Sequence, residues 1–201
     1  MMIATLLASS ANGAITTYTS LSGFTTAIAS LSGDRFDEDF ESFTSDTSYA
    51  ASAVPLDGFS VSAFGSASGS AYQIDVSPFN NSGKQNVDGT NYLVGNNLFN
   101  TRGYQFSFDE PIMAFGVDID DVENANTALL LSDGTTFGLS NGFRGFISDI
   151  PITYVRSTGG GTGDSVGFDN FTIVTQIPEP SSALIFCLAA MGFVGRRRLR
   201  K

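Results

Sequence analysis

The sequence contains no histidine, no tryptophan and a single cysteine, Cys187, among its 201 residues. A single cysteine excludes a disulfide framework within the chain. The absence of histidine excludes His-dependent catalytic triads and haem ligation by histidine, and with one cysteine the usual Cys/His zinc sites are excluded as well. Any bound metal is therefore expected to be a hard cation held by oxygen ligands, such as calcium.

Charged residues are also scarce, at 15% of the chain, and acidic side chains outnumber basic ones by 20 to 10. The formal net charge of -10 argues against nucleic acid as a partner, because phosphate binding requires a basic face. Half of the basic residues lie together at the C-terminus, namely Arg196, Arg197, Arg198, Arg200 and Lys201. Residues 1–195 therefore hold five basic and twenty acidic side chains, a net charge of -15, and this acidic body ends in a compact basic tail.

The segment 181–195, which precedes the basic tail, has no charged residue. Fifteen helical residues cover about 22 Å, which makes the segment a short candidate for a transmembrane helix across a hydrocarbon layer of about 30 Å. The positive-inside rule then leaves the arginine cluster in the cytoplasm and the acidic body outside. The alternative is a terminal core helix with a solvated basic end, although such a helix normally has a polar face and this segment has none.

Pro178, Glu179 and Pro180 lie just upstream of the apolar segment. The two prolines stop a helix from continuing upstream and present Glu179 in an extended, accessible stretch at the membrane surface. The C-terminus thus has Pro-Glu-Pro first, an apolar segment next and an Arg-rich end last. This order, at this position, resembles the PEP-CTERM sorting signal. This resemblance implies recognition by exosortase, a membrane cysteine transpeptidase-like enzyme, and a temporary anchor in the inner membrane. Residues 177–201 are therefore assigned to the sorting signal and left out of the fold prediction.

An exported protein also needs an export signal, and residues 1–14 combine a short apolar core with small residues that suit a signal peptidase. The positively charged region that normally opens a signal peptide is missing. Two interpretations are open: the segment is the remnant of a longer signal peptide with an upstream start codon, or it is a disordered N-terminus. A C-terminal sorting signal requires export, which favours the first, with the mature chain beginning near Ala14 or Ile15.

The remaining residues, 15–176, predict an all-β domain with one short helix. Leu21, Phe24, Ile28 and Leu31 have helical spacing within 19–32, where Thr19 or Ser20 is the predicted cap and Gly33 the stop. Period-two alternation predicts short strands over 35–43, 58–64, 71–76, 92–95, 104–108, 112–120, 127–131, 135–139, 144–148, 152–156 and 166–174. Turn dipeptides at 57–58, 88–89, 133–134 and 141–142 separate several of them. This pattern predicts a two-sheet antiparallel β-sandwich, similar to a jelly roll.

The same region resembles the lectin-like or carbohydrate-binding-module-like ectodomains that often precede PEP-CTERM tails. The resemblance is carried by residues 36–43, 110–120, 145–153 and 167–171, where hydrophobic residues alternate with glycine and aspartate. It implies a surface or extracellular-matrix protein that associates with exopolysaccharide, although a fold of this kind does not by itself determine function.

Acidic side chains are the main candidates for chemistry. Asp118 and Asp120 lie two residues apart in a predicted strand and therefore share one face. Glu41 is expected near Asp169 if the first and last strands of the sandwich lie side by side. These four carboxylates form a candidate calcium site. The alternative is a solvated acidic face, because the sequence has no twelve-residue EF-hand loop.

Two further hypotheses concern the binding and the hydrolysis of sugars. Five tyrosines are candidate sugar-binding platforms: Tyr49, Tyr72, Tyr92, Tyr104 and Tyr154. The alternative is that they are core or rim residues. Glycoside hydrolysis would need two carboxylates at a set separation across a cleft, and we expect no enzymatic activity. The sequence thus predicts an exported structural or exopolysaccharide-associated protein. The alternatives are a calcium-dependent carbohydrate-binding adhesin and, less favoured, a glycoside hydrolase.

Overall fold

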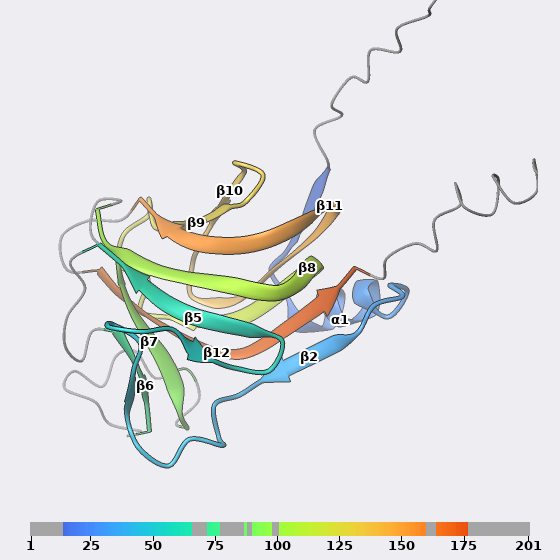
Figure 1. The fold of residues 1–201 in the computed structure, drawn as a ribbon. Helices are drawn as coiled ribbons and strands as arrows, with labels where there is room; N and C mark the ends of the chain where they lie inside the picture. The colour runs from blue at the N-terminus through green and yellow to red at the C-terminus, as the bar shows by residue number, and fades with distance from the viewer. Residues whose placement is uncertain are drawn as a thin grey trace, which may run out of the picture.

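A computed structural model describes residues 14–65, 72–76, 87, 90–97, 101–159 and 164–176. Apart from one helix, the regular secondary structure of the described part consists of β-strands (Figure 1). Its elements are β1 (Ile15–Tyr18), α1 (Leu21–Ile28), β2 (Arg35–Glu38), β3 (Thr47–Ser48), β4 (Val54–Pro55), β5 (Phe59–Phe64), β6 (Tyr72–Asp75), β7 (Tyr92–Asn97), β8 (Gly103–Asp120), β9 (Ala128–Leu131), β10 (Thr136–Gly138), β11 (Gly142–Thr158) and β12 (Asp164–Thr175).

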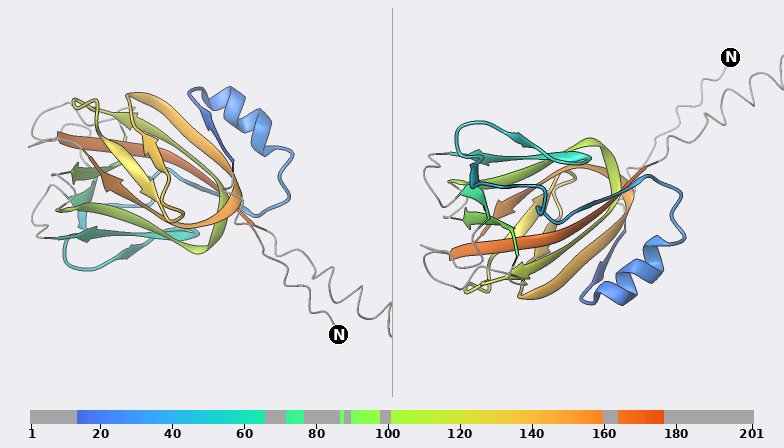
Figure 2. Two further views of the ribbon diagram at one scale, coloured as in Figure 1. Left: turned by 90° about the horizontal axis from the view of Figure 1, so that it is seen from above. Right: turned by 90° about the horizontal axis from the view of Figure 1, so that it is seen from below.

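All the strands belong to one antiparallel sheet, in which two long strands, β8 and β11, pair along nearly their whole length. The first half of β8 is flanked by β5 and by the second half of β11, which continues to β9 and β10. The second half of β8 is flanked by the first half of β11 and by β12. Because the two halves of the same ladder have different neighbours, the sheet folds over into two layers. Figure 2 shows the long strands turning back at one end of the molecule.

The two layers enclose a core of phenylalanine rings. Phe106 and Phe115 lie nine residues apart on β8, a separation of about 30 Å along a straight strand. Their ring centroids are 6.3 Å apart, which shows that β8 folds back on itself. Phe106 also lies within 5.7 Å of Phe168 and 5.1 Å of Phe171 on β12. All four rings are buried, and edge-on packing of this kind stabilises aromatic pairs beyond simple burial.

Each of the two long strands contains a proline at the position where it bends. Pro111 on β8 and Pro151 on β11 directly precede the paired residues Ile112 and Ile152, where the register between the strands is irregular. Proline has no N–H for a sheet hydrogen bond and is tolerated in strands at bulges. The chain therefore bends at both prolines, and we call this part of the molecule the bend end.

Tyr49 connects strands of the two layers through its hydrogen bonds. Its backbone N–H donates to the Tyr72 carbonyl on β6, and its carbonyl accepts from the Ala63 N–H on β5. Its hydroxyl donates to the Val94 carbonyl on β7. Burial raises the pKa of Tyr49 well above its ordinary value, so the hydroxyl stays protonated as this donor. One residue thus connects three strands.

The helix α1 begins after Ser20, whose hydroxyl accepts a hydrogen bond from the Gly23 N–H, as the sequence predicted. Its buried residues are Phe24 and Ile28. The Phe24 ring rests on Gly116 and Gly145, which are direct partners on β8 and β11. Any side chain at Gly116 would meet this ring, because an added Cβ would lie 2.6 Å from Phe24 Cε1. The glycine pair therefore forms the seat of the helix.

Three predictions about the fold need correction. Two separate sheets were expected, but the strands form one sheet. The strands 104–108 and 112–120 were expected to be independent, as were 144–148 and 152–156. The first two belong to β8 and the last two to β11, because the chain bends at Pro111 and Pro151 and continues in the same ladder. The strand expected over 35–43 ends at Glu38. Phe40 takes a left-handed backbone conformation (φ 59°), which ends the strand and turns its ring into the core. The described residues include no helix long and apolar enough to cross a membrane.

We expect Gly116→Ala to lower the free energy of unfolding by about 1–3 kcal/mol, because Phe24 must move away from its seat. Gly138→Ala is the matched control, since nothing lies within 4 Å of an added Cβ there, and its effect should stay within about 0.5 kcal/mol. Urea unfolding of both variants measures the difference. Equal stability of the two variants would show that the glycine seat has no role in docking the helix.

Candidate functional site

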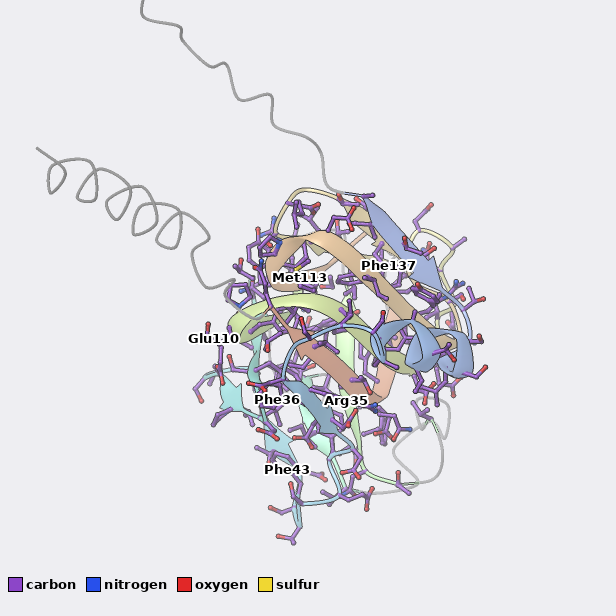
Figure 3. The ribbon with its side chains drawn as sticks, turned by 90° about the vertical axis from the view of Figure 1, so that its right-hand side faces the viewer. Arg35, Phe36, Phe43, Glu110, Met113 and Phe137 are labelled. Carbon is purple, nitrogen blue, oxygen red and sulfur yellow. The ribbon has the colours of Figure 1, made fainter. Side chains whose placement is uncertain are left out.

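The candidate site lies where two strands meet end to end beside β12. β7 pairs with β12 up to Phe168, and β2 pairs with it from Phe171 onward. Asp169 and Asn170 lie between the end of the β7 register and the start of the β2 register. β2, which begins the first strand expected from the sequence, thus lies beside β12, the last strand. Figure 3 shows this side of the molecule, with Arg35 and Phe36 on β2.

A bulge in β12 shapes this junction. The pairing between β12 and β8 shifts by one residue between Asp169 and Thr172, and Asn170 has a left-handed backbone (φ 51°). Asparagine tolerates this conformation better than most residues. The bulge exposes the Asn170 side chain, whose Nδ2 donates to Asp118 Oδ2 at 3.2 Å. The bulge therefore places an amide and a carboxylate next to one another on the outer face of the sheet.

Asp169 is buried, with 1% of its surface exposed, beneath the start of β7. Its Oδ1 accepts a hydrogen bond from the Asn170 N–H at 2.7 Å, and its Oδ2 accepts from the Thr90 hydroxyl at 3.5 Å. A buried carboxylate requires such donors, because an unpaired charge is costly away from water. Asp169 therefore helps to hold the segment that leads into β7 against the bulge.

The turn after β2 uses its own carboxylates to organise the backbone. Glu38 Oε1 accepts from the Phe40 N–H at 2.8 Å, and Asp39 Oδ1 accepts from the Glu41 N–H at 3.1 Å. Glu41 Oε1 accepts from the Asn91 N–H at 2.9 Å, across to the segment before β7. The carboxylates of Glu38, Asp39 and Glu41 thus act as hydrogen-bond acceptors for the backbone, and Glu41 connects the turn after β2 to the start of β7.

Asp37 forms the centre of a polar groove beside this turn. Its Oδ1 accepts from the Thr172 hydroxyl at 2.6 Å and from the Arg35 guanidinium at 2.9 Å. The groove has a volume of about 400 Å³, and its polar lining includes Asp39, Asp118 and Asn170 in addition. Carboxylates, an amide, a hydroxyl and a guanidinium therefore face one open space. We call this space the β2–β12 groove.

The four residues predicted as a calcium site are only partly brought together. Asp118 and Asp120 point outward on the same face of β8, between buried neighbours, as predicted. Asp118 and Asp169 are direct partners on β8 and β12. Glu41 and Asp169 contact consecutive residues, Asn91 and Thr90. Within the described ranges, no three carboxylate or thiol side chains form a group that could hold a metal ion, and the calcium site stays a prediction.

The tyrosines proposed as sugar platforms are core residues in four of five cases. Tyr49, Tyr72, Tyr92 and Tyr104 are all at most 1% exposed. Burial also raises the pKa of Tyr72 above its ordinary value. Only Tyr154 is partly exposed. These four side chains therefore pack the interior and offer no surface to a ligand.

Sequence reasoning missed Asn170, Thr172 and Asp37 as parts of one groove. A left-handed bulge leaves little trace in a sequence, although the Asp-Asn pair at 169–170 is a composition that favours such a conformation. The residues of the predicted sorting signal, which are Pro178, Glu179, Pro180, Arg196, Arg197, Arg198, Arg200 and Lys201, lie outside the described residues.

Comparison with family models matches residues 176–198 to the PEP-CTERM protein-sorting motif. The match covers the Pro-Glu-Pro residues, the apolar segment and the first part of the basic tail. It supports an exported precursor that is anchored in the membrane and processed by an exosortase. Neither a comparison with curated proteins nor one with solved structures found a match.

We expect Asn170→Ala to lower the free energy of unfolding by about 1–2 kcal/mol, because alanine disfavours the left-handed backbone of the bulge. Asn170→Gly removes the same hydrogen bond to Asp118 but fits this backbone, so it should cost less. Chemical denaturation of both variants separates the two contributions. A glycine variant as unstable as the alanine variant would assign the whole effect to the side chain.

Proposed function

We propose that this chain is an exported surface or extracellular-matrix protein with a structural or exopolysaccharide-associated role. The observation that carries the proposal is the sorting motif at 176–198, which follows directly on the last strand of the folded domain. In this proposal the exosortase cleaves near Pro178-Glu179-Pro180 and releases or transfers the β domain. In this proposal the chain is the substrate of the processing step, and the covalent chemistry of that step belongs to the exosortase.

The body of the chain has properties that suit this role. Its net charge of -15 over residues 1–195 keeps an exported domain soluble and discourages nonspecific contacts with other acidic polymers. The folding of one sheet into two layers buries the apolar faces of most strands. A domain of this length can bury its core without disulfides, which suits a structural component outside the cell.

A second candidate, a calcium-dependent carbohydrate-binding adhesin, is favoured by the β2–β12 groove. Sugar hydroxyls are recognised by carboxylates, amides and guanidinium groups, and Asp37, Asp118, Asn170 and Arg35 supply all three at this groove. The tyrosines are largely absent from the surface, so recognition there would depend on hydrogen bonds more than on stacking. Calcium held by Asp118 and its neighbours would supply a further ligand for sugar hydroxyls.

We expect Glu179→Ala to leave the unprocessed precursor in the inner membrane, because the sorting motif would lose its central carboxylate. Glu123→Ala, which changes a surface glutamate of the folded domain, is the matched control and should be processed normally. Fractionation of cells followed by immunoblotting measures the ratio of precursor to processed form. Normal processing of Glu179→Ala would remove this residue from the sorting signal.

For the adhesin, we expect the processed protein to co-sediment with the exopolysaccharide of its host in calcium and to be released by a chelator. Asp118→Asn should weaken binding about tenfold, the loss expected for a hydrogen bond to a charged group. Asp133→Asn changes an exposed aspartate in the turn between β9 and β10 and should bind as the wild type does. Absence of sedimentation in both buffers would reject the adhesin and leave the structural role.

A further inference from the structure

The end of the folded domain lies close to the start of the sorting motif. The Gln176 N–H donates to the Pro111 carbonyl at 2.8 Å, and the Thr175 N–H donates to the Asp34 carbonyl at 2.9 Å. Gln176, the first residue of the motif, is therefore still held by the bend end of the sheet. At the other end of the described chain, the Ala14 carbonyl accepts from the Asp149 N–H, which also lies at the bend. Figure 2 shows both ends of the described chain leaving from this side.

Only four residues, 177–180, separate Gln176 from the apolar segment 181–195. Fully extended, four residues reach at most about 14 Å. The twelve residues of β12 alone span about 40 Å along the domain. In the membrane-anchored precursor, which is the premise taken from the proposed function, the tether is therefore much shorter than the domain. The bend end must lie beside the membrane and the opposite end away from it.

Charge decides which side of the bend end approaches the lipid. The tip of the bend exposes Asp109, Glu110 and Asp149, and these carboxylates are repelled by phosphate headgroups. Figure 3 places Glu110 at this tip. By contrast, residues 14–33, which form β1 and α1, contain no charged residue. Leu21 also borders the acidic β2–β12 groove, so the repulsion is lowest when the domain lies on the part of α1 that faces away from that groove.

The outer face of α1 has the composition of a lipid-contacting surface. Its exposed residues are Leu21, Ser22, Thr25, Thr26 and Ala29, which line one shallow hollow. Leu21 is 51% exposed and is the large hydrophobic side chain that the described residues leave most open to solvent. The C-terminal end of the helix approaches the tether, because Gly33 packs directly against the Thr175 carbonyl. Arg35 lines an adjoining hollow with Thr25 and Ala29. Its Nε and Nη2 donate to Asp37, and its Nη1 can meet a headgroup phosphate.

We propose that the outer face of α1 is a membrane-docking surface that lies on the lipid headgroups while the precursor is anchored. The partner is a phospholipid surface, and the short tether and the uncharged face select this orientation together. The docked domain leaves the opposite end of the sandwich, where β8 begins, turned away from the membrane. Gln176, the first residue of the sorting motif, is then held close to the bilayer and within reach of a membrane enzyme.

The test uses the full chain in vesicles of phosphatidylethanolamine and phosphatidylglycerol, with no exosortase present. Cys187→Ser provides a background without other thiols, and Ala29→Cys and Ala125→Cys provide two labelling sites. Both alanines are exposed, but Ala29 ends α1 whereas Ala125 lies near Thr158 and Gly159 at the far end. A fluorophore on each site is quenched by lipids that carry a spin label on the headgroup.

We expect several-fold stronger quenching at position 29 than at position 125. Insertion of a long Gly-Ser linker after Gln176 should reduce quenching at position 29, because the tether no longer enforces contact. Leu21→Asp should also reduce it, and circular dichroism and urea unfolding establish that this exposed substitution leaves the fold intact. Equal quenching at the two positions, or stronger quenching at 125, would overturn the proposal.

A protein partner is the alternative occupant. Protection of the position 29 label in native membranes that contain the processing enzyme, with no quenching in pure lipid vesicles, would assign the helix face to that enzyme and reject lipid docking. The Glu179→Ala experiment reports on processing alone, whereas the vesicle experiment contains no enzyme. Failure of the docking proposal and failure of the sorting proposal are therefore distinguishable.

Discussion

The contact between Phe106 and Phe115 is the constraint on which the rest of this structure depends. Both rings belong to β8, and they meet only because the strand folds back at Pro111. That fold takes β11 with it, since the two strands remain paired on either side of the bend. The aromatic rings of β5 and β12 then pack onto Phe106, as the contacts of Phe59 and Phe171 show. A single folded ladder thus creates both layers and the core between them.

The folded ladder also determines where the functional features lie. The second half of β8 offers one edge to β12, and β12 in turn offers its far edge to β2 and β7 in succession. The junction of those two strands lies at Asp169 and Asn170, between the register of β7 and that of β2, and the bulge at Asn170 lies there. At the other end of β12, the chain leaves from the bend and enters the sorting motif. The strand β12 therefore determines both where the candidate site lies and where the chain enters the sorting motif.

Sequence reasoning succeeded where local chemistry decides the structure. The Ser20 cap, the buried Phe24 and Ile28, and the outward pair Asp118 and Asp120 follow from hydrogen bonding and periodicity over a few residues. It failed at Pro111, because a proline normally ends a strand, and here the loss of an N–H donor is absorbed by the bend of a continuous ladder. It also placed Phe40 in a strand, since the left-handed turn there depends on the Glu38 carboxylate and on burial of the ring, which are contacts of the folded state.

The acidic cluster can organise the turn and still bind a ligand, because a carboxylate has more acceptor positions than the backbone uses. Each ionised carboxylate offers about four lone-pair positions. Glu38, Asp39 and Glu41 each accept a hydrogen bond from a backbone N–H. Asp37 differs, since its Oδ1 is already shared by Thr172 and Arg35. A sugar or a cation that enters the groove would therefore meet preorganised acceptors at Asp39 and Asp118. Their positions are fixed by the turn and the bulge before any ligand arrives, which lowers the entropy lost on binding.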